Sequence, residues 1–73
     1  MHNNIILEKV KKIAKFYNGK LMEIEPCSHL LAIYFKFDSE NKALDFKNKV
    51  FAERIANIFK IITVTDMIVY INN

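Results

Sequence analysis

The sequence predicts an α+β fold, a two-layer sandwich with the element order α-β-β-α-β-β. Two segments repeat apolar residues every three or four positions, as amphipathic helices do, and each is followed by two segments that read as strands. Hydrophobic residues make up 52% of the 73-residue chain, whereas disordered chains are poor in them. We therefore expect residues 1–73 to form one domain, with a four-stranded antiparallel sheet and both helices on one face.

The first helix is expected over residues 4–17. Asn3 or Asn4 is suited to cap its first turn. Apolar residues recur at helical spacing and form the side expected to be buried: Ile6, Val10, Ile13, Ala14 and Phe16 or Tyr17. Asn18 and Gly19 follow, and both tolerate the left-handed conformation that closes a helix. The first helix is thus expected to end just before this pair.

A first hairpin is expected next, with strands over residues 20–25 and 29–37. Pro26 cannot donate a hydrogen bond to a sheet, so residues 26–28 are predicted to form the turn. The second strand is apolar on both faces, which is typical of a central strand. Its helix-facing residues are predicted to be Leu31, Ile33, Phe35 and Phe37.

The second helix is expected to begin at Asp38 or Ser39, which are good N-cap residues, and to continue to about Phe59. Phe51 is expected to broaden its buried side. The predicted buried stripe consists of Ala43, Phe46, Val50, Ile55 and Ile58 or Phe59. A last hairpin is predicted from residues 60–65 and 67–72, with its turn near Asp66.

If both helices cover one face of the sheet, alternate residues of the central strands lie on the other face. An uncovered apolar face of this kind usually marks a contact surface, and a domain this small gains from burying it against a partner. The expected protein-interface residues are Leu30, Ala32, Tyr34, Ile68 and Tyr70. We expect a protein partner there, or self-association as a homodimer.

Positive charge is concentrated in the first predicted helix, although the net charge of the chain is only +3. The candidate contacts for phosphate or an acidic partner are Lys9, Lys11, Lys12 and Lys15. An ordinary solvated helix face would look the same. Lysines that bind phosphates, together with Tyr34 and Tyr70 as stacking platforms, make nucleic-acid binding the alternative function.

Residues capable of acid–base or nucleophilic chemistry are few. The histidines are His2 and His29, and Cys27 lies two positions before His29 without an acidic or amide residue placed to orient the ring. Cys27 and His29 are also too few for a structural zinc site, and Glu23 and Glu25 are expected to keep an edge strand soluble. We therefore expect no catalytic residues, no metal and no cofactor.

The order of elements around the second strand resembles that of the pterin-4a-carbinolamine dehydratase family. The residues that carry this resemblance are Phe35, Phe37, Ala43, Phe46 and Val50, with Ala52-Glu53 slightly displaced. The family has a His-His-Pro motif after the helix that contributes to its pterin site, whereas this chain has Ile58-Phe59-Lys60. The resemblance therefore implies the fold and a tendency to self-associate through the sheet, and it does not imply dehydratase activity.

Cysteine content and hydrophobic runs bear on location. A single cysteine, Cys27, cannot form an internal disulfide, which favours a reducing, cytoplasmic setting. We expect no signal peptide, because the apolar stretch within residues 1–7 is too short for a signal-peptide core and has no basic residue before it. We expect no membrane span, because no apolar run approaches the ~18 residues that a span requires. The sequence thus predicts a non-enzymatic protein-interaction module: a homo-oligomer, an adaptor or an inhibitor.

Overall fold

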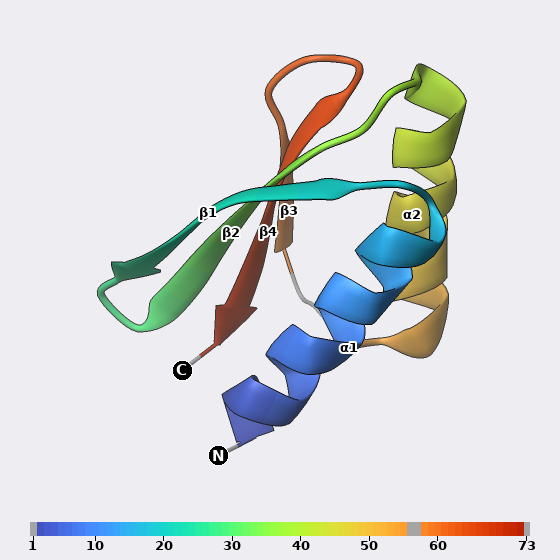
Figure 1. Ribbon diagram of the computed structural model, residues 1–73. Coiled ribbons are helices and arrows are strands. Elements are labelled where there is room, and N and C mark those ends of the chain that lie inside the picture. Colours follow the sequence, from blue (N-terminus) through green and yellow to red (C-terminus); the bar gives the residue numbers. More distant parts are fainter. Residues whose placement is uncertain (1, 56–57, 73) are drawn as a thin grey trace.

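The computed structural model describes residues 2–55 and 58–72, without the side chains of residues 2, 3 and 58. Figure 1 shows two helices packed beside a twisted four-stranded sheet. The elements are α1 (His2–Phe16), β1 (Lys20–Cys27), β2 (Leu30–Lys36), α2 (Glu40–Glu53), β3 (Ile58–Ile61) and β4 (Asp66–Asn72). The strand order is β1-β2-β4-β3, and every pair is antiparallel. The predicted fold class, element order and central position of β2 are confirmed.

Both helices lie on one side of the sheet, which we call the covered face (Figure 1). Val10 and Ala14 of α1 and Phe46 of α2 are buried there. The ring of Phe46 lies 4.9 Å from the ring of Phe37 and 5.3 Å from that of Phe35, centroid to centroid. The buried residues that β2 and β4 contribute to this core are Ile33, Phe35, Met67, Val69 and Ile71, and the buried Phe37 directly follows β2. The predicted helix-facing side of β2 is therefore correct, with Leu31 partly buried against the same core.

The end of α1 depends on Asn18 and Gly19 in different ways. Asn18 adopts the left-handed conformation (φ 60°), and the Gly19 N–H donates to the carbonyl of Ala14 at 2.6 Å. Gly19 itself is not left-handed. Glycine is needed here because there is no room for a side chain: an added Cβ would lie 2.8 Å from Cζ of Phe37 and 2.9 Å from the Ala14 oxygen. The predicted stop is confirmed, but only Asn18 supplies the left-handed residue.

The start of α1 differs from the prediction. The helix begins at His2, so Asn3 and Asn4 lie within its first turn and neither is the N-cap. Because Ile5 and Ile6 already follow the helical repeat, the helix extends to the beginning of the described chain. Neither helix in the described ranges has the length and apolar character to cross a membrane.

The prediction is correct for the start of α2 and wrong for its end. Ser39 is the N-cap as predicted, and its hydroxyl accepts the Lys42 N–H at 3.2 Å. The predicted continuation to about Phe59 is wrong, because Arg54 adopts the left-handed conformation (φ 55°) and its N–H donates to the Phe51 carbonyl. Phe59 lies instead in β3, where strand alternation turns it toward the core.

The buried stripe of α2 is shorter than predicted. Ile55 is partly buried against the core but lies beyond the helix, and the side chain of Ile58 is outside the described residues. Phe51 is 43% exposed and packs edge-on against Phe59 at 4.7 Å, so it does not broaden the buried side. The buried residues of the helix are Ala43, Phe46 and Val50.

The first hairpin turns later than predicted. Its turn is Ser28 and His29, with Ser28 left-handed (φ 56°), and Pro26 lies inside β1. Proline is tolerated because β1 is an edge strand. A bulge at Met22 shifts the register of β1 against β2. The prediction of a 26–28 turn is therefore wrong by about two residues.

The last hairpin also shifts. β3 ends at Ile61, and Asp66 is the first residue of β4 rather than part of the turn, so the predicted 60–65 strand is wrong. The Asp66 N–H donates to the hydroxyl of Thr63 at 3.1 Å, and the Ile62 N–H donates to the Asp66 carbonyl at 3.0 Å. The threonine hydroxyl thus closes a turn that lacks glycine.

Candidate protein-interaction surface

The side of the sheet opposite the helices is the candidate site, and we call it the open face (Figure 1). It takes alternate residues from each strand, from Leu30 to Lys36 in β2 and from Asp66 to Asn72 in β4. No described element packs over it. A partner can therefore reach this face without any change in the fold.

The structure brings the five predicted interface residues together on the open face. Tyr34 is paired with Ile68 across β2 and β4, and Ala32 is paired with Tyr70 in the same way. Leu30 lies at the end of this patch, opposite Asn72. The two tyrosines are diagonal neighbours, within reach of each other's rings. The predicted placement is thus correct, and their contact with a partner stays a prediction.

The five residues are not equally accessible. Ala32 is only 2% exposed and Ile68 only 5%, although neither belongs to the core between sheet and helices. Because both helices lie on the opposite side, side chains of the open face itself must shield them. Tyr34, Tyr70 and Leu30 are half-buried. A partner would therefore contact the tyrosine rings and Leu30, whereas Ala32 and Ile68 lie beneath them.

Charged residues border this apolar centre. Glu23 and Glu25 lie on β1, beside Tyr34 and Ala32, while Lys60 lies on β3 beside Ile68. All three side chains are exposed. The middle of the β1 edge is therefore acidic, with Lys20 at the start of the strand, and the β3 edge carries the basic Lys60.

The surroundings of Tyr34 raise the pKa of its hydroxyl. Desolvation is the main cause that raises the pKa of Tyr34, and the negative charge of Glu25 is the next. Tyr70, Glu23 and Cys27 raise it further. Tyr34 therefore stays a neutral hydrogen-bond donor over a wider pH range than a free tyrosine does.

The four candidate lysines do not share a surface with the tyrosines. They lie along α1, on the helix side of the sheet, with Lys9, Lys12 and Lys15 exposed. Lys11 is partly buried and pairs with Glu8 at 3.3 Å. A ligand that uses the lysines of α1 therefore lies on the other side of the domain from one that uses Tyr34 and Tyr70.

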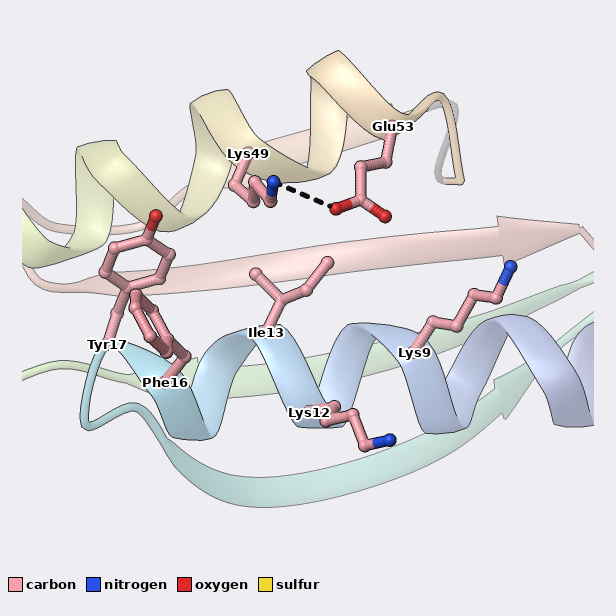
Figure 2. Close-up of a pocket in the computed structure, with 7 residues that line it drawn as sticks. All are labelled: Lys9, Lys12, Ile13, Phe16, Tyr17, Lys49 and Glu53. Atoms are coloured by element: carbon pink, nitrogen blue, oxygen red, sulfur yellow. Dashed lines mark ion pairs between the residues drawn. The ribbon is translucent and has the colours of Figure 1, made fainter.

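A shallow groove of about 620 Å³ runs between the two helices (Figure 2). In Figure 2, Ile13 points from α1 toward the gap below α2, and the ion pair of Lys49 with Glu53, at 3.2 Å, lies on the α2 side. Phe16 is 79% exposed and its ring stands edge-on to Tyr17 at 5.0 Å. The remaining residues of the groove are Lys9 and Lys12.

Sequence reasoning missed this groove. Phe16 followed the apolar repeat of the first helix, so it was expected among the buried positions with Tyr17 as the alternative. The groove also depends on how far α2 lies from α1, which no residue pattern in a single helix specifies. The signal that was available is the pair of adjacent aromatic residues, because a helix cannot turn both toward one core.

The residues considered for catalytic or metal-binding chemistry are Cys27, His29 and His2. Cys27 is a free, exposed cysteine at the end of β1, and His29 is exposed in the turn. The side chain of His2 is outside the described residues. Within residues 2–55 and 58–72, no three His, Cys, Asp or Glu side chains form a group that could hold a metal ion.

Comparison with known proteins adds no assignment to these surfaces. The open face, the lysines of α1 and the groove are therefore judged on their own geometry. The resemblance to the pterin-4a-carbinolamine dehydratase family stays a prediction. The chain matches no family model, no curated protein and no solved structure.

Proposed function

We propose that the domain is a non-enzymatic protein-interaction module that binds a protein partner through its open face. One observation carries this proposal: no element of the described ranges covers the centre of this face of the four-stranded sheet, which presents half-buried tyrosines. Tyrosine supplies a large contact area with few rotatable bonds and is enriched where interfaces derive most of their affinity. Glu23, Glu25 and Lys60 form a charged border of the kind that selects partners and fixes orientation.

The lysines of α1 have a smaller part in this proposal than the sequence indicated. They lie behind the sheet when viewed from the open face. Charges act over about 8 Å at physiological salt, so lysines on the far layer contribute little at the contact itself. They add to long-range attraction of acidic partners, and the specificity rests on the residues of the open face.

The test compares Tyr34→Lys with Phe16→Lys, which makes the same change at an exposed aromatic residue of the helix layer. Complexes of the tagged domain, with itself or with partners identified by mass spectrometry, are measured by size exclusion with light scattering. We expect Tyr34→Lys to lose the complex and Phe16→Lys to keep it, both folded by circular dichroism. A folded Tyr34→Lys domain that keeps every complex would contradict the proposal.

Nucleic-acid binding through the helix layer is a second candidate function. It is favoured by one observation: Phe16, 79% exposed, lies in a groove with Lys9 and Lys12, and aromatic rings beside lysines are typical of single-strand binding. Tyr34 and Tyr70 have no part in it, because they lie on the opposite face. Salt-dependent binding of a labelled oligonucleotide that is lost in the variant K9A/K12A would support it.

A further inference from the structure

The register of the sheet arranges the open face in cross-strand rows, and one row crosses all four strands. From one edge of the sheet to the other it contains Glu23, Tyr34, Ile68 and Lys60. The row therefore begins with an acid, passes through an aromatic and an aliphatic side chain, and ends with a base. Its two halves differ in sign, which makes the row complementary to its own reverse.

We propose that a second copy of this chain covers the open face, related to the first by a two-fold axis that runs parallel to the strands between β2 and β4. This inference rests on the proposed function and names its partner. Such a rotation places β1 of each copy over β3 of the other. Glu23 then faces Lys60 of the second copy, and Tyr34 faces Ile68 of the second copy, each contact occurring twice.

The neighbouring rows follow the same rule. On one side, Lys36 is paired with Asp66, and the rotation places each over the opposite charge in the second copy. On the other side, Ala32 is paired with Tyr70, and the rotation places the large side chain over the small one. On the two central strands, three successive cross-strand pairs thus match by charge or by size under one operation.

A different two-fold axis does not give this match. An axis perpendicular to the strands, passing through the central row, places Glu23 over Glu23 and Lys60 over Lys60. Like charges are then superposed at both edges. The same perpendicular axis places Glu25 over Lys20 at the edge of β1, so its two opposite-charge contacts are offset by two like-charge contacts. The parallel axis makes four opposite-charge contacts, Glu23 with Lys60 and Lys36 with Asp66 twice each, and no like-charge contact in these rows. Since both axes would bury the same tyrosines, the charged residues favour the parallel axis.

The geometry of packed sheets accommodates the contact. Two aligned sheets lie about 10 Å apart and cross at about 30°, and glutamate and lysine are long enough to meet across that distance at the edges. Glu23 and Lys60 are both exposed. Among the described residues, the ion pairs are Lys11–Glu8, Lys42–Asp38 and Lys49–Glu53, so neither is engaged within its own chain.

Charge reversal tests the pairing directly. In Glu23→Lys and in Lys60→Glu, each homodimer brings like charges together twice, and we expect its dissociation constant to rise about tenfold. In an equimolar mixture of the two variants, both contacts join opposite charges again. We expect the mixed dimer to recover the wild-type dissociation constant, measured by sedimentation with differently labelled chains. The matched controls, Asp45→Lys and Lys12→Glu on the helices, should leave dimerisation unchanged alone and mixed.

Cross-linking tests the axis independently of affinity. In a Cys27→Ser background, the variant with both Glu23→Cys and Lys60→Cys should form a covalent dimer with a short bismaleimide, because facing residues of two packed sheets are too far apart for a direct disulfide. Glu23→Cys alone should not be cross-linked by the same reagent. Self-cross-linking of Glu23→Cys alone would overturn the parallel axis, because it requires β1 to face β1.

The outcomes separate this inference from the proposed function. A wild-type dimer that Tyr34→Lys disrupts, but whose charge reversals behave like the controls, overturns the pairing and leaves the open face as the contact surface. A wild-type chain that stays monomeric, while Tyr34→Lys abolishes a complex with a different identified protein, overturns the second copy as partner. A folded Tyr34→Lys chain with no change in any association overturns both. Recovery only in the mixture supports the pairing.

Discussion

The two faces of the sheet bury isoleucine to nearly the same extent by different means. Ile33 on the covered face is 0% exposed and belongs to the core formed with both helices. Ile68 on the open face is 5% exposed, yet it lies outside that core and is shielded by neighbours on its own face. Low exposure alone therefore does not distinguish residues of the core between sheet and helices from residues of the open face.

This comparison predicts different costs for the same truncation. Ile33→Ala leaves a cavity between two layers, and we expect it to lower the free energy of unfolding by about 3–4 kcal/mol, whereas Ile68→Ala should cost only about 1–2 kcal/mol in the monomer. Urea denaturation at high dilution measures both. If Ile33→Ala does not fold, Ile33→Val and Ile68→Val give the same ranking on a smaller scale. Equal losses at dilution would break the comparison between the faces.

The covered face is also tested where α1 ends. In Gly19→Ala the new Cβ would lie 2.8 Å from Cζ of Phe37 and against a backbone oxygen that cannot move independently, so we expect a loss of about 1–3 kcal/mol. Asn18→Gly is the control, because Asn18 already has the left-handed conformation that glycine adopts freely. Thermal unfolding of both variants measures the difference. A Gly19→Ala domain as stable as the wild type would mean that Phe37 is not held tightly beneath the helix.

A smaller effect is expected at the start of α2. Ser39→Ala removes the hydroxyl that accepts the Lys42 N–H, and the expected loss is about 1 kcal/mol. Ser39→Asp keeps an acceptor at this position and should retain the stability. Urea denaturation separates the two variants. The packing of the covered face depends on α2. An equal loss of stability in both variants would show that the loss does not come from the missing cap.

The smallest expected effect concerns alkaline pH on the open face. The folded state holds the Tyr34 proton more tightly than the unfolded chain does, because desolvation first and Glu25 next raise its pKa. This contribution to stability is complete below about pH 10 and is lost as the pH rises through the folded pKa. Tyr34→Phe should therefore lose less stability than the wild type above pH 10. Glu25→Gln should lower the pKa of Tyr34 in an ultraviolet titration, and an unchanged titration would argue against a shared environment.

Local residue patterns predicted most of the fold. The alternation in β2 identified the covered face, Ser39 identified the start of α2, and Asn18 identified the end of α1. The end of α2 was not predictable in the same way, because Arg54 carries no sequence signal for the left-handed conformation it adopts. Because α2 ends earlier than predicted, the strands of the final hairpin also begin earlier. Its turn was hard to predict because it is closed by the hydroxyl of Thr63 and lacks the glycine that usually indicates a turn.

The candidate site was predictable in placement and less so in detail. Alternation along two strands was enough to put Tyr34 and Tyr70 on one face with Leu30. The exposure of these residues was not predictable from alternation, because the shielding of Ile68 depends on which strands lie beside β4. The charged row depends on the order of all four strands, which brings Glu23 of β1 and Lys60 of β3 into one row although they are far apart in the sequence.

The outermost strands limit how large an assembly of this domain becomes. β1 contains Pro26 and the bulge at Met22, and β3 has only four residues and carries Lys60. Irregular, short or charged margins of this kind resist the addition of further strands from other molecules. In the proposed dimer, two copies joined through their open faces would therefore form a finite pair, because addition of further strands is disfavoured at both edges of each sheet.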